Sequence, residues 1–202
     1  MMTRPGRGRG YHHGNLREAL LDEAERALAR EGAAGLALRA IARAVGVTHT
    51  AAYHHFPDRE ALLRAVAARG FDRFAAALAA GERRMAGARG FQEMGVAYVR
   101  FAVEHASLFR LMFGPEAARG RDADEALRAA SDRAFQVLLA GVRRVAPRAD
   151  EDAVRRRAVA AWSAVHGLSA LLLDGQLEHA GFSADDPERA AREVLGGGAP
   201  PR

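Results

Sequence analysis

Apolar residues recur at helical spacing along most of the chain. The first such stretch covers residues 15–30, where Leu16, Leu20 and Leu28 share one face, and Gly32 follows it. The later stretches with this spacing cover residues 38–45, 49–55, 59–80, 91–105, 107–113, 124–145, 150–173 and 187–195. A period of three to four residues is typical of amphipathic helices. The pattern therefore predicts an all-α fold of about nine helices.

Residues that start or stop helices stand between these stretches. Asn15 and Glu18 have the spacing of a capping box, in which each side chain bonds to the other's backbone amide. Thr48 and Asp150 each precede a helical stretch and are expected to be N-caps. Asp186-Pro187 opens the last helix, since proline costs least at the first helical position. Gly46 stands where a helix end takes a left-handed residue.

These signals divide the chain into four parts. Residues 1–13 are rich in Gly and Arg and are expected to form a disordered basic arm. Residues 14–60 hold three short helices, and residues 61–195 hold the longer ones. Residues 196–202 are expected to fray. Residues 119–121, between two helical stretches, are interpreted as a polar loop.

Composition narrows the class of protein. All basic residues are Arg, Ile occurs once and Cys is absent, so strands, disulfides and thiolate sites are disfavoured. The net charge of +5 permits an anionic partner without establishing one. No apolar run reaches the roughly 18 residues of a membrane span, and the N-terminus does not resemble a secretory signal. We therefore expect a cytoplasmic protein with no membrane partner.

The three short helices fit a helix-turn-helix. Ile41 and Ala42 are expected to pack on the first helix, and Gly46 to turn the chain. Ala51 and Ala52 would let the third helix lie close to its neighbours. The polar residues on the edge of that helix are Thr48, His49, Thr50, Tyr53 and His54. Such side chains can bond to bases or phosphates, but they also fit a solvated or packed surface.

The order of these residues is similar to a known family. The segments Leu38-Arg39-Ala40-Ile41-Ala42, Gly46-Val47-Thr48, Tyr53-His54-His55-Phe56 and Asp58-Arg59-Glu60-Ala61-Leu62 resemble the DNA-binding domain of the TetR/AcrR (tetracycline-repressor) regulators. Residues 11–17 resemble one subgroup of that family. Residues 162–168 resemble the C-terminal domain of the subgroup, which is named for its Trp, His and Gly.

The resemblance implies roles for residues at the DNA. Residues 48–55 would be the recognition helix, with Tyr53 and His55 facing phosphate. Arg59 stands where the family often has a phosphate-binding Lys. The family usually has Thr or Ser at position 37, where this chain has Ala37, so a cap is lost at a cost of about 1 kcal/mol. Arg39 is the candidate to replace the phosphate contact.

The resemblance also implies a small-molecule inducer bound in the second domain. The polar contacts would be Tyr98, His105 and His166, and the walls would be Phe101, Phe109, Met112, Phe113 and Trp162. Trp162 and His166 share one helix face at a spacing of four residues. The alternative is an ordinary helical core in which His166 is a packed histidine rather than a ligand contact.

A homodimer is the third implication of the resemblance. Small and apolar residues on the eighth predicted helix would face its symmetry mate, and these are Ala158, Ala161, Val165, Leu168 and Leu172. A two-fold dimer would match a palindromic double-stranded operator. The implied function is a transcriptional repressor released from its operator by a ligand. An activator or a ligand-independent regulator of the same fold remains open.

Two other classes of protein fit the sequence less well. An enzyme is disfavoured because Gly6, Gly8 and Gly10 do not follow a strand and no serine lies in a nucleophile elbow. A non-specific DNA-packaging protein differs from a regulator in showing no strong preference for one sequence. No cofactor is expected. His54 and His55 are disfavoured as a metal pair because adjacent helical side chains diverge and no third ligand is placed.

Overall fold

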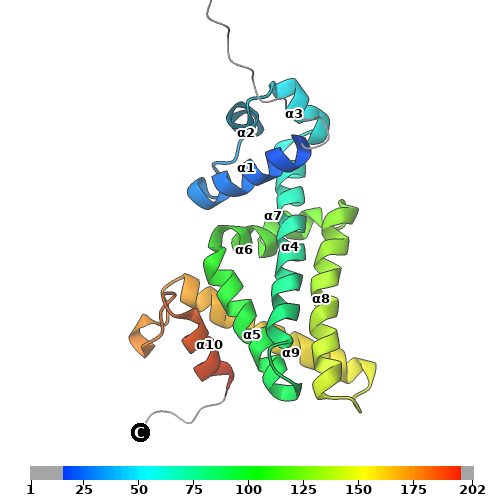
Figure 1. Cartoon of the computed structure of the whole chain (residues 1–202), viewed down its shortest axis with the longest axis vertical. Helices are drawn as coiled ribbons and strands as arrows, with labels where there is room; N and C mark the ends of the chain where they lie inside the picture. Colours follow the sequence, from blue (N-terminus) through cyan, green and yellow to red (C-terminus); the bar gives the residue numbers. More distant parts are fainter. Residues whose placement is uncertain (1–15, 197–202) are drawn as a thin grey trace, which may run out of the picture. The chain divides into compact units, whose positions relative to one another are not determined.

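The described part of the chain, residues 16–196 of a computed structural model, is built from helices (Figure 1). Its elements are α1 (Leu16–Glu31), α2 (Leu38–Val45), α3 (His49–His55), α4 (Arg59–Glu82), α5 (Gly87–Glu104), α6 (Ala106–Phe113), α7 (Pro115–Gly120), α8 (Glu125–Val145), α9 (Glu151–Leu173), the 3₁₀ turn η2 (Glu178–Ala180) and α10 (Pro187–Leu195). The all-α prediction is confirmed. Asn15 of the capping box, the basic arm and residues 197–202 of the tail lie outside the described residues.

The chain divides into two compact units, with the boundary between Leu62 and Leu63 inside α4. The first unit holds α1, α2, α3 and the first turn of α4. Its core is formed by α1 and α2 together with Phe56, which is 2% exposed. The Arg17 guanidinium lies over the Phe56 ring at 5.4 Å from its centroid, a cation–π arrangement. A few long apolar side chains thus hold three short helices together.

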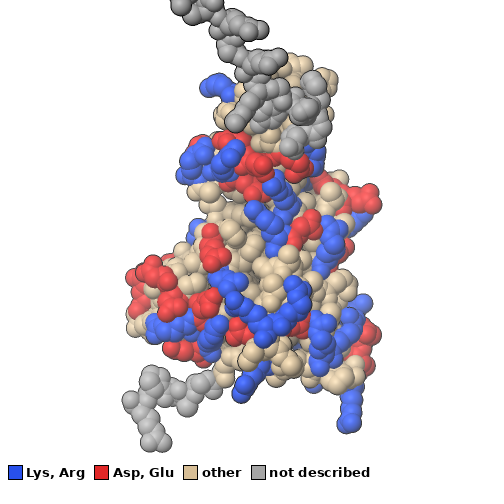
Figure 2. Space-filling model, viewed as in Figure 1, with Lys and Arg blue, Asp and Glu red and all other residues tan. Residues whose placement is uncertain are grey.

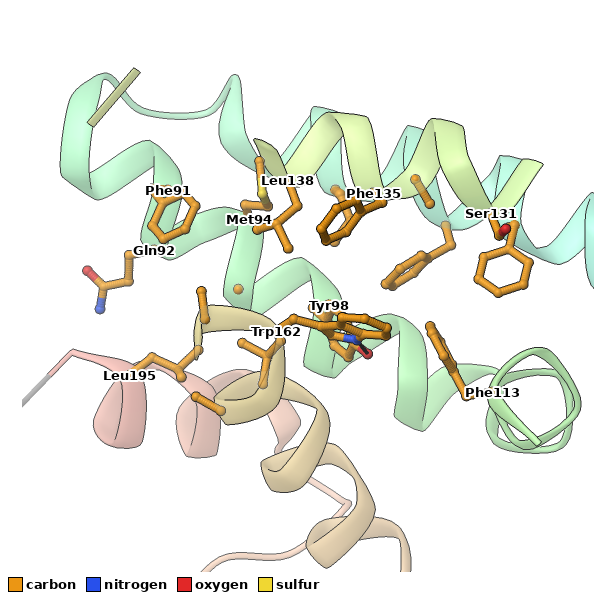
Figure 3. A pocket seen from close by; sticks show the side chains of 18 of the residues that line it. Phe91, Gln92, Met94, Tyr98, Phe113, Ser131, Phe135, Leu138, Trp162 and Leu195 are labelled. Atoms are coloured by element: carbon orange, nitrogen blue, oxygen red, sulfur yellow. Dashed lines mark hydrogen bonds between the residues drawn. The ribbon is translucent and has the colours of Figure 1, made fainter. Parts of the chain in front are cut away.

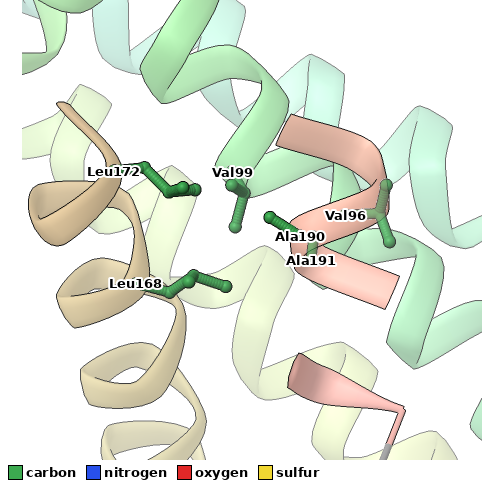
Figure 4. Close-up of a cluster of buried hydrophobic side chains, with 6 residues drawn as sticks. All are labelled: Val96, Val99, Leu168, Leu172, Ala190 and Ala191. Carbon is green, nitrogen blue, oxygen red and sulfur yellow. The ribbon is translucent and has the colours of Figure 1, made fainter. Parts of the chain in front are cut away.

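The second unit holds the rest of α4 and the helices from α5 to α10. Here α9 packs against both α5 and α8, and α10 packs against α5. Figure 4 shows the cluster that joins α5, α9 and α10, formed by Val96, Val99, Leu168, Leu172, Ala190 and Ala191. The alanines let α10 approach α5 closely, and two ion pairs flank the contact: Arg192 with Glu93 at 3.1 Å and Arg100 with Glu188 at 3.0 Å.

Several helix starts follow the sequence signals. The side-chain oxygens of Thr48, Asp150 and Asp186 each accept a hydrogen bond from a backbone amide three residues later, and Pro187 is the first residue of α10. Two boundaries differ from the prediction. The fifth helix begins at Gly87 rather than Phe91, and residues 115–120 form α7, so Arg119 belongs to a helix rather than to a loop. Pro115 starts α7 because its missing amide is not needed there.

Candidate DNA interface and ligand pocket

The turn between α2 and α3 has the predicted geometry. Gly46 has φ +80°, and its amide donates to the carbonyls of Ala42 and Arg43. The amide of Val47 also donates to the Ala42 carbonyl, at 3.0 Å. A left-handed residue at this position is favourable for glycine and strained for residues with a Cβ. Ile41 and Ala42 are buried, so the turn presents α3 on a fixed support.

One side of α3 is buried and the other is open. Thr48 Oγ1 accepts from the Ala51 amide at 3.2 Å, which fixes the start of the helix. Ala52 is fully buried, whereas Tyr53 is 39% exposed. The other exposed polar side chains of α3 and its cap are Thr48, His49, Thr50, His54 and His55. The predicted polar edge is therefore exposed, and its contact with DNA stays a prediction.

The start of α2 bears out the loss of a cap. Ala37 occupies the N-cap position without a side-chain hydrogen bond, and the first turn of α2 contains no acidic residue. Arg39 is exposed in this turn. An exposed guanidinium at the N-terminal end of a helix is well suited to bind phosphate. The structure is thus compatible with the phosphate contact predicted for Arg39.

Arg59 is engaged inside its own unit. Its Nε donates to the Leu36 carbonyl at 2.9 Å and its Nη2 donates to the Ala33 carbonyl at 2.5 Å. Its Nη1 lies 3.7 Å from a carboxylate oxygen of Glu60. These bonds tie the first turn of α4 to the loop between α1 and α2. The side chain predicted to bind phosphate therefore already has a structural role.

The second unit contains a cavity of about 560 Å³ between α4, α5, α8 and α9. Aromatic rings from all four helices and from α6 line it: Phe71, Phe74, Phe91, Tyr98, Phe113, Phe135 and Trp162. Figure 3 shows Gln92 and Leu195 at one end and Phe113 and Ser131 at the other. A mostly apolar cavity of this size with a few polar groups is typical of small-molecule sites.

Three of the eight predicted ligand residues line this cavity: Tyr98, Phe113 and Trp162. The other five are not part of its lining. Phe101, Phe109 and Met112 are buried in the core, and the exposed ring of His105 packs on Phe101 with the ring centroids 4.7 Å apart. His166 contacts Tyr98 from outside the lining. The sequence alone does not show which of these side chains line the cavity and which are buried in the core outside its lining.

A short hydrogen-bonded chain joins Trp162, Tyr98 and His166. Trp162 Nε1 donates to the Tyr98 hydroxyl at 3.1 Å, and that hydroxyl lies 2.8 Å from Nδ1 of His166. Because an indole N–H can only donate, the hydroxyl accepts from it and is free to donate to Nδ1. Nδ1 then carries no proton. Burial raises the pKa of Tyr98 and lowers the pKa of His166, so both groups stay neutral at pH 7.

Replacing Tyr98 with Phe is expected to reduce stability by about 1–2 kcal/mol, because Trp162 and His166 each lose a partner. In the wild type, the pKa of His166 is lower in the folded chain than in the unfolded chain. As the pH falls, this imidazole is therefore protonated in the unfolded chain before it is protonated in the folded chain. Stability should therefore fall as the pH drops from about 6.5 towards the lower pKa of the folded state. Urea denaturation between pH 7.5 and pH 5 measures both effects.

The control for this substitution is Tyr53→Phe, because Tyr53 is exposed on α3. It should leave the stability at pH 7.5 unchanged. His166→Gln should remove the part of the acid-induced loss that arises from this imidazole. A wild-type acid response that persists unaltered in His166→Gln would rule out the role of the imidazole.

Some pocket residues were not found from the sequence. Gln92 and Leu195 lie outside the predicted set, and Arg121 belongs to the predicted polar loop, for which the sequence indicates no role. Arg121 lies just after α7, in a segment without a clear apolar period. Leu195 reaches the pocket because α10 packs back on α5. The positions of Arg121 and Leu195 depend on how helices distant in sequence pack together. The spacing of apolar residues within one helix does not predict this packing.

The five residues predicted for a dimer contact lie within the second unit. Leu168 and Leu172 belong to the cluster with α5 and α10, and Ala158 packs with Leu139 and Val142 of α8. Ala161 and Val165 line the pocket. Small residues permit close approach to any helix, whether it belongs to the same chain or to another. The residues of α9 that remain exposed include Val159, Ala160, Ser163, Ala164 and Leu171.

Two further properties concern the described residues only. Among residues 16–196, no group of three or more His, Cys, Asp or Glu side chains is placed to hold a metal ion. None of the helices in that range is both long enough and apolar enough to cross a membrane. On the face shown in Figure 2, acidic and basic side chains are interspersed.

Comparison with known proteins gives matches in both units. Residues 20–66 match the family described as bacterial regulatory proteins, tetR family. Residues 91–196 match the family described as tetracyclin repressor-like, C-terminal domain. No match to a curated protein is found. The two family matches together account for most of the described chain.

Solved structures agree with these matches. A protein of unknown function from Rhodococcus sp. RHA1 is 34% identical over 94% of this chain and 98% of that chain, with a TM-score of 0.76. PfmR, a TetR family regulator from Thermus thermophilus, is 21% identical over 90% and 99%, with a TM-score of 0.62. A transcriptional regulator from Saccharomonospora viridis in complex with choline is 19% identical over 91% and 96%, with a TM-score of 0.64.

Proposed function

The chain belongs to the tetR family of DNA-binding transcriptional regulators, and from this premise we propose that it is a cytoplasmic, homodimeric repressor released from a palindromic operator by a small molecule. The observation that carries the proposal is the aromatic cavity of about 560 Å³ in the second unit. We also place the chain in the subgroup named for its Trp, His and Gly. The sequence of residues 162–168, which contains Trp162, His166 and Gly167, supports that placement.

The first unit supports sequence reading by α3. A capped, rigidly supported helix with an open polar edge can enter the major groove, which is wide enough for one helix. His49, Thr50 and His54 would read base edges. Thr48, Tyr53 and His55 would contact phosphate, together with Arg39. The exposed polar edge and the absence of acidic residues from α3 support these roles.

The second unit supports control by a ligand. The neighbour from Saccharomonospora viridis is in complex with choline, which indicates that this fold can accept a small molecule. Phe71, Phe74 and Leu78 of α4 line the cavity, and the same helix begins in the DNA-binding unit. A ligand that shifts α4 would change the spacing of the two recognition helices. DNA and ligand would then weaken each other's binding by the same factor.

Dimerisation is proposed through the face of α9 that its own chain leaves open. Val159 is 49% exposed and Leu171 is 44% exposed, and both are large apolar side chains. A face that carries them together with small residues suits close packing against a symmetry-related helix. Of the five residues predicted for the dimer contact, Ala158, Leu168 and Leu172 are buried within this chain, so the proposed face consists of residues that stay exposed.

The central test is selection of binding sequences from random double-stranded DNA. A palindromic selected site, bound at least 10³-fold tighter than unrelated DNA, is the expected result. A site without two-fold symmetry would contradict the dimer, and the absence of any preferred site would favour non-specific packaging. Transcription from a promoter carrying the site then separates repression from activation. Binding that no small molecule weakens would favour the ligand-independent alternative.

Arg39→Ala is expected to weaken binding to every DNA sequence and to reduce the slope of log K against log salt by about 0.9, because one phosphate contact is lost. His49→Ala should instead change the preferred bases and leave the slope nearly unchanged. Fluorescence anisotropy at several salt concentrations measures both. The control is Arg26→Ala, since Arg26 pairs with Glu23 on α1. An unchanged slope in Arg39→Ala would exclude the phosphate contact.

A further inference from the structure

One nitrogen of an arginine that lines the aromatic cavity has no hydrogen-bond partner. Arg121 is part of the lining, and its Nε is buried without a hydrogen-bond partner. Buried donors are nearly always paired, because removing one from water without a partner is strongly unfavourable, above all for a charged group. A buried guanidinium N–H beside an apolar cavity therefore points to an acceptor that the protein itself does not supply.

The segment that carries Arg121 is tied to α4. Three residues further along the chain, Asp124 caps α8, with its Oδ1 accepting from the Leu127 amide at 3.0 Å. The other oxygen of Asp124 lies 3.3 Å from Nε of Arg64 on α4. These bonds hold the segment between α7 and α8 on α4. Within that segment, the Arg121 Cζ lies 5.9 Å from the centroid of the Phe71 ring.

The carboxylate that the protein itself places in the lining does not pair with Nε of Arg121. Asp132 of α8 also lines the cavity, and its side chain is exposed. Nε of Arg121 forms no hydrogen bond with this carboxylate. The hydroxyl of Ser131 donates to the Arg128 carbonyl at 2.9 Å. The lining around Arg121 otherwise consists largely of aromatic and aliphatic side chains.

We infer that the pocket recognises an organic acid, with Arg121 pairing with its carboxylate and the aromatic lining covering a largely apolar body of about one or two rings. This inference rests on the proposed function, since it names the ligand class of the same cavity. The planar guanidinium matches a carboxylate in shape and charge and can bind it through two parallel hydrogen bonds. The cavity volume of about 560 Å³ lies within the usual range for ligands of this size.

Near Arg121, the same geometry disfavours a cationic ligand. Aromatic rings can hold an ammonium group over their faces. Here the guanidinium of Arg121 already lies over the Phe71 ring, and a second positive charge near it would be repelled. The ligand class inferred for this chain therefore differs in charge from the choline bound by the Saccharomonospora viridis neighbour.

The chain contains its own probe for this pocket. Trp162 is the only tryptophan and it lines the cavity, so its fluorescence reports occupancy. Three ligands with the same phenyl body are to be titrated into the full chain at pH 7.5 without DNA: 4-phenylbutyrate, 4-phenylbutanamide and 4-phenylbutylamine. They carry a negative, a neutral and a positive head group. The acid is expected to bind at least about 10-fold tighter than the amide. The amine is expected to bind more weakly than either.

Arg121→Gln should reduce the affinity for the acid to that for the amide and leave the amide unchanged. Arg121→Met tests the same loss of charge with a side chain that keeps the apolar stem. The control is Arg119→Gln, an exposed arginine of α7 that does not line the cavity, and it should behave as the wild type. Circular dichroism of each variant confirms that the fold is retained.

Several outcomes would overturn the inference. These are equal affinity for acid and amide in the wild type, a preference for the acid that survives in both Arg121 variants, or no fluorescence response to any probe at millimolar concentration. The DNA measurements are independent of this titration. An acid that fills the pocket without weakening binding to the selected operator would contradict release by a ligand and leave the recognition of acids intact.

Discussion

Phe74→Ala is expected to lower the free energy of unfolding by about 3–5 kcal/mol, a large share of the total for a protein of this size. The ring is 3% exposed and stands at the centre of the aromatic cluster. Its centroid lies 4.8 Å from that of Tyr98, 5.1 Å from that of Phe101 and 5.9 Å from that of Phe113. Removing it takes away the packing of three neighbours and leaves a void in addition to the cavity already present.

The matched control is Phe135→Ala. Phe135 also lines the cavity, but it is half-buried and its ring contact is with Trp162, with the centroids 6.1 Å apart. We expect a loss of less than half that of Phe74→Ala. Urea denaturation followed by circular dichroism measures both. Equal losses would show that the two rings contribute alike and that Phe74 is not central to the cluster.

The parts of the fold that could be predicted depend on neighbours in sequence. Gly46 has the left-handed conformation, and Thr48 caps α3, because both effects act within a few residues. Three of the ligand contacts implied by the family resemblance, Tyr98, Phe113 and Trp162, also line the cavity.

The parts that could not be predicted depend on partners distant in sequence. Ala158 and Leu168 fit a dimer surface equally well as an internal contact, and the choice is made by the packing of α8, α5 and α10. Arg121 lies in a segment without an apolar period, and an ion pair between Arg64 of α4 and Asp124, distant in sequence, ties that segment to α4. Sequence spacing identifies a helix face but does not identify what covers it.

Arg59→Ala is expected to destabilise the DNA-binding unit by about 3 kcal/mol. The side chain donates two hydrogen bonds to the carbonyls of Leu36 and Ala33, and bonds from a charged donor contribute about 1.5–3 kcal/mol each. Those carbonyls lie in the loop that sets the approach of α2 to α1. Hydrogen exchange of the backbone amides in residues 33–41 should accelerate in this variant, and urea denaturation gives the total loss.

Arg59→Lys separates this structural role from the phosphate contact implied by the family resemblance. Lysine keeps the positive charge and binds phosphate as a point charge, but it lacks the planar fork that reaches two carbonyls at once. If Arg59 acts by tying the loop to α4, Arg59→Lys should lose most of the stability that Arg59→Ala loses. The salt slope for DNA binding should then match the wild type in both variants. Full stability in Arg59→Lys, together with a slope reduced by about 0.9 in Arg59→Ala alone, would instead assign the guanidinium to the DNA.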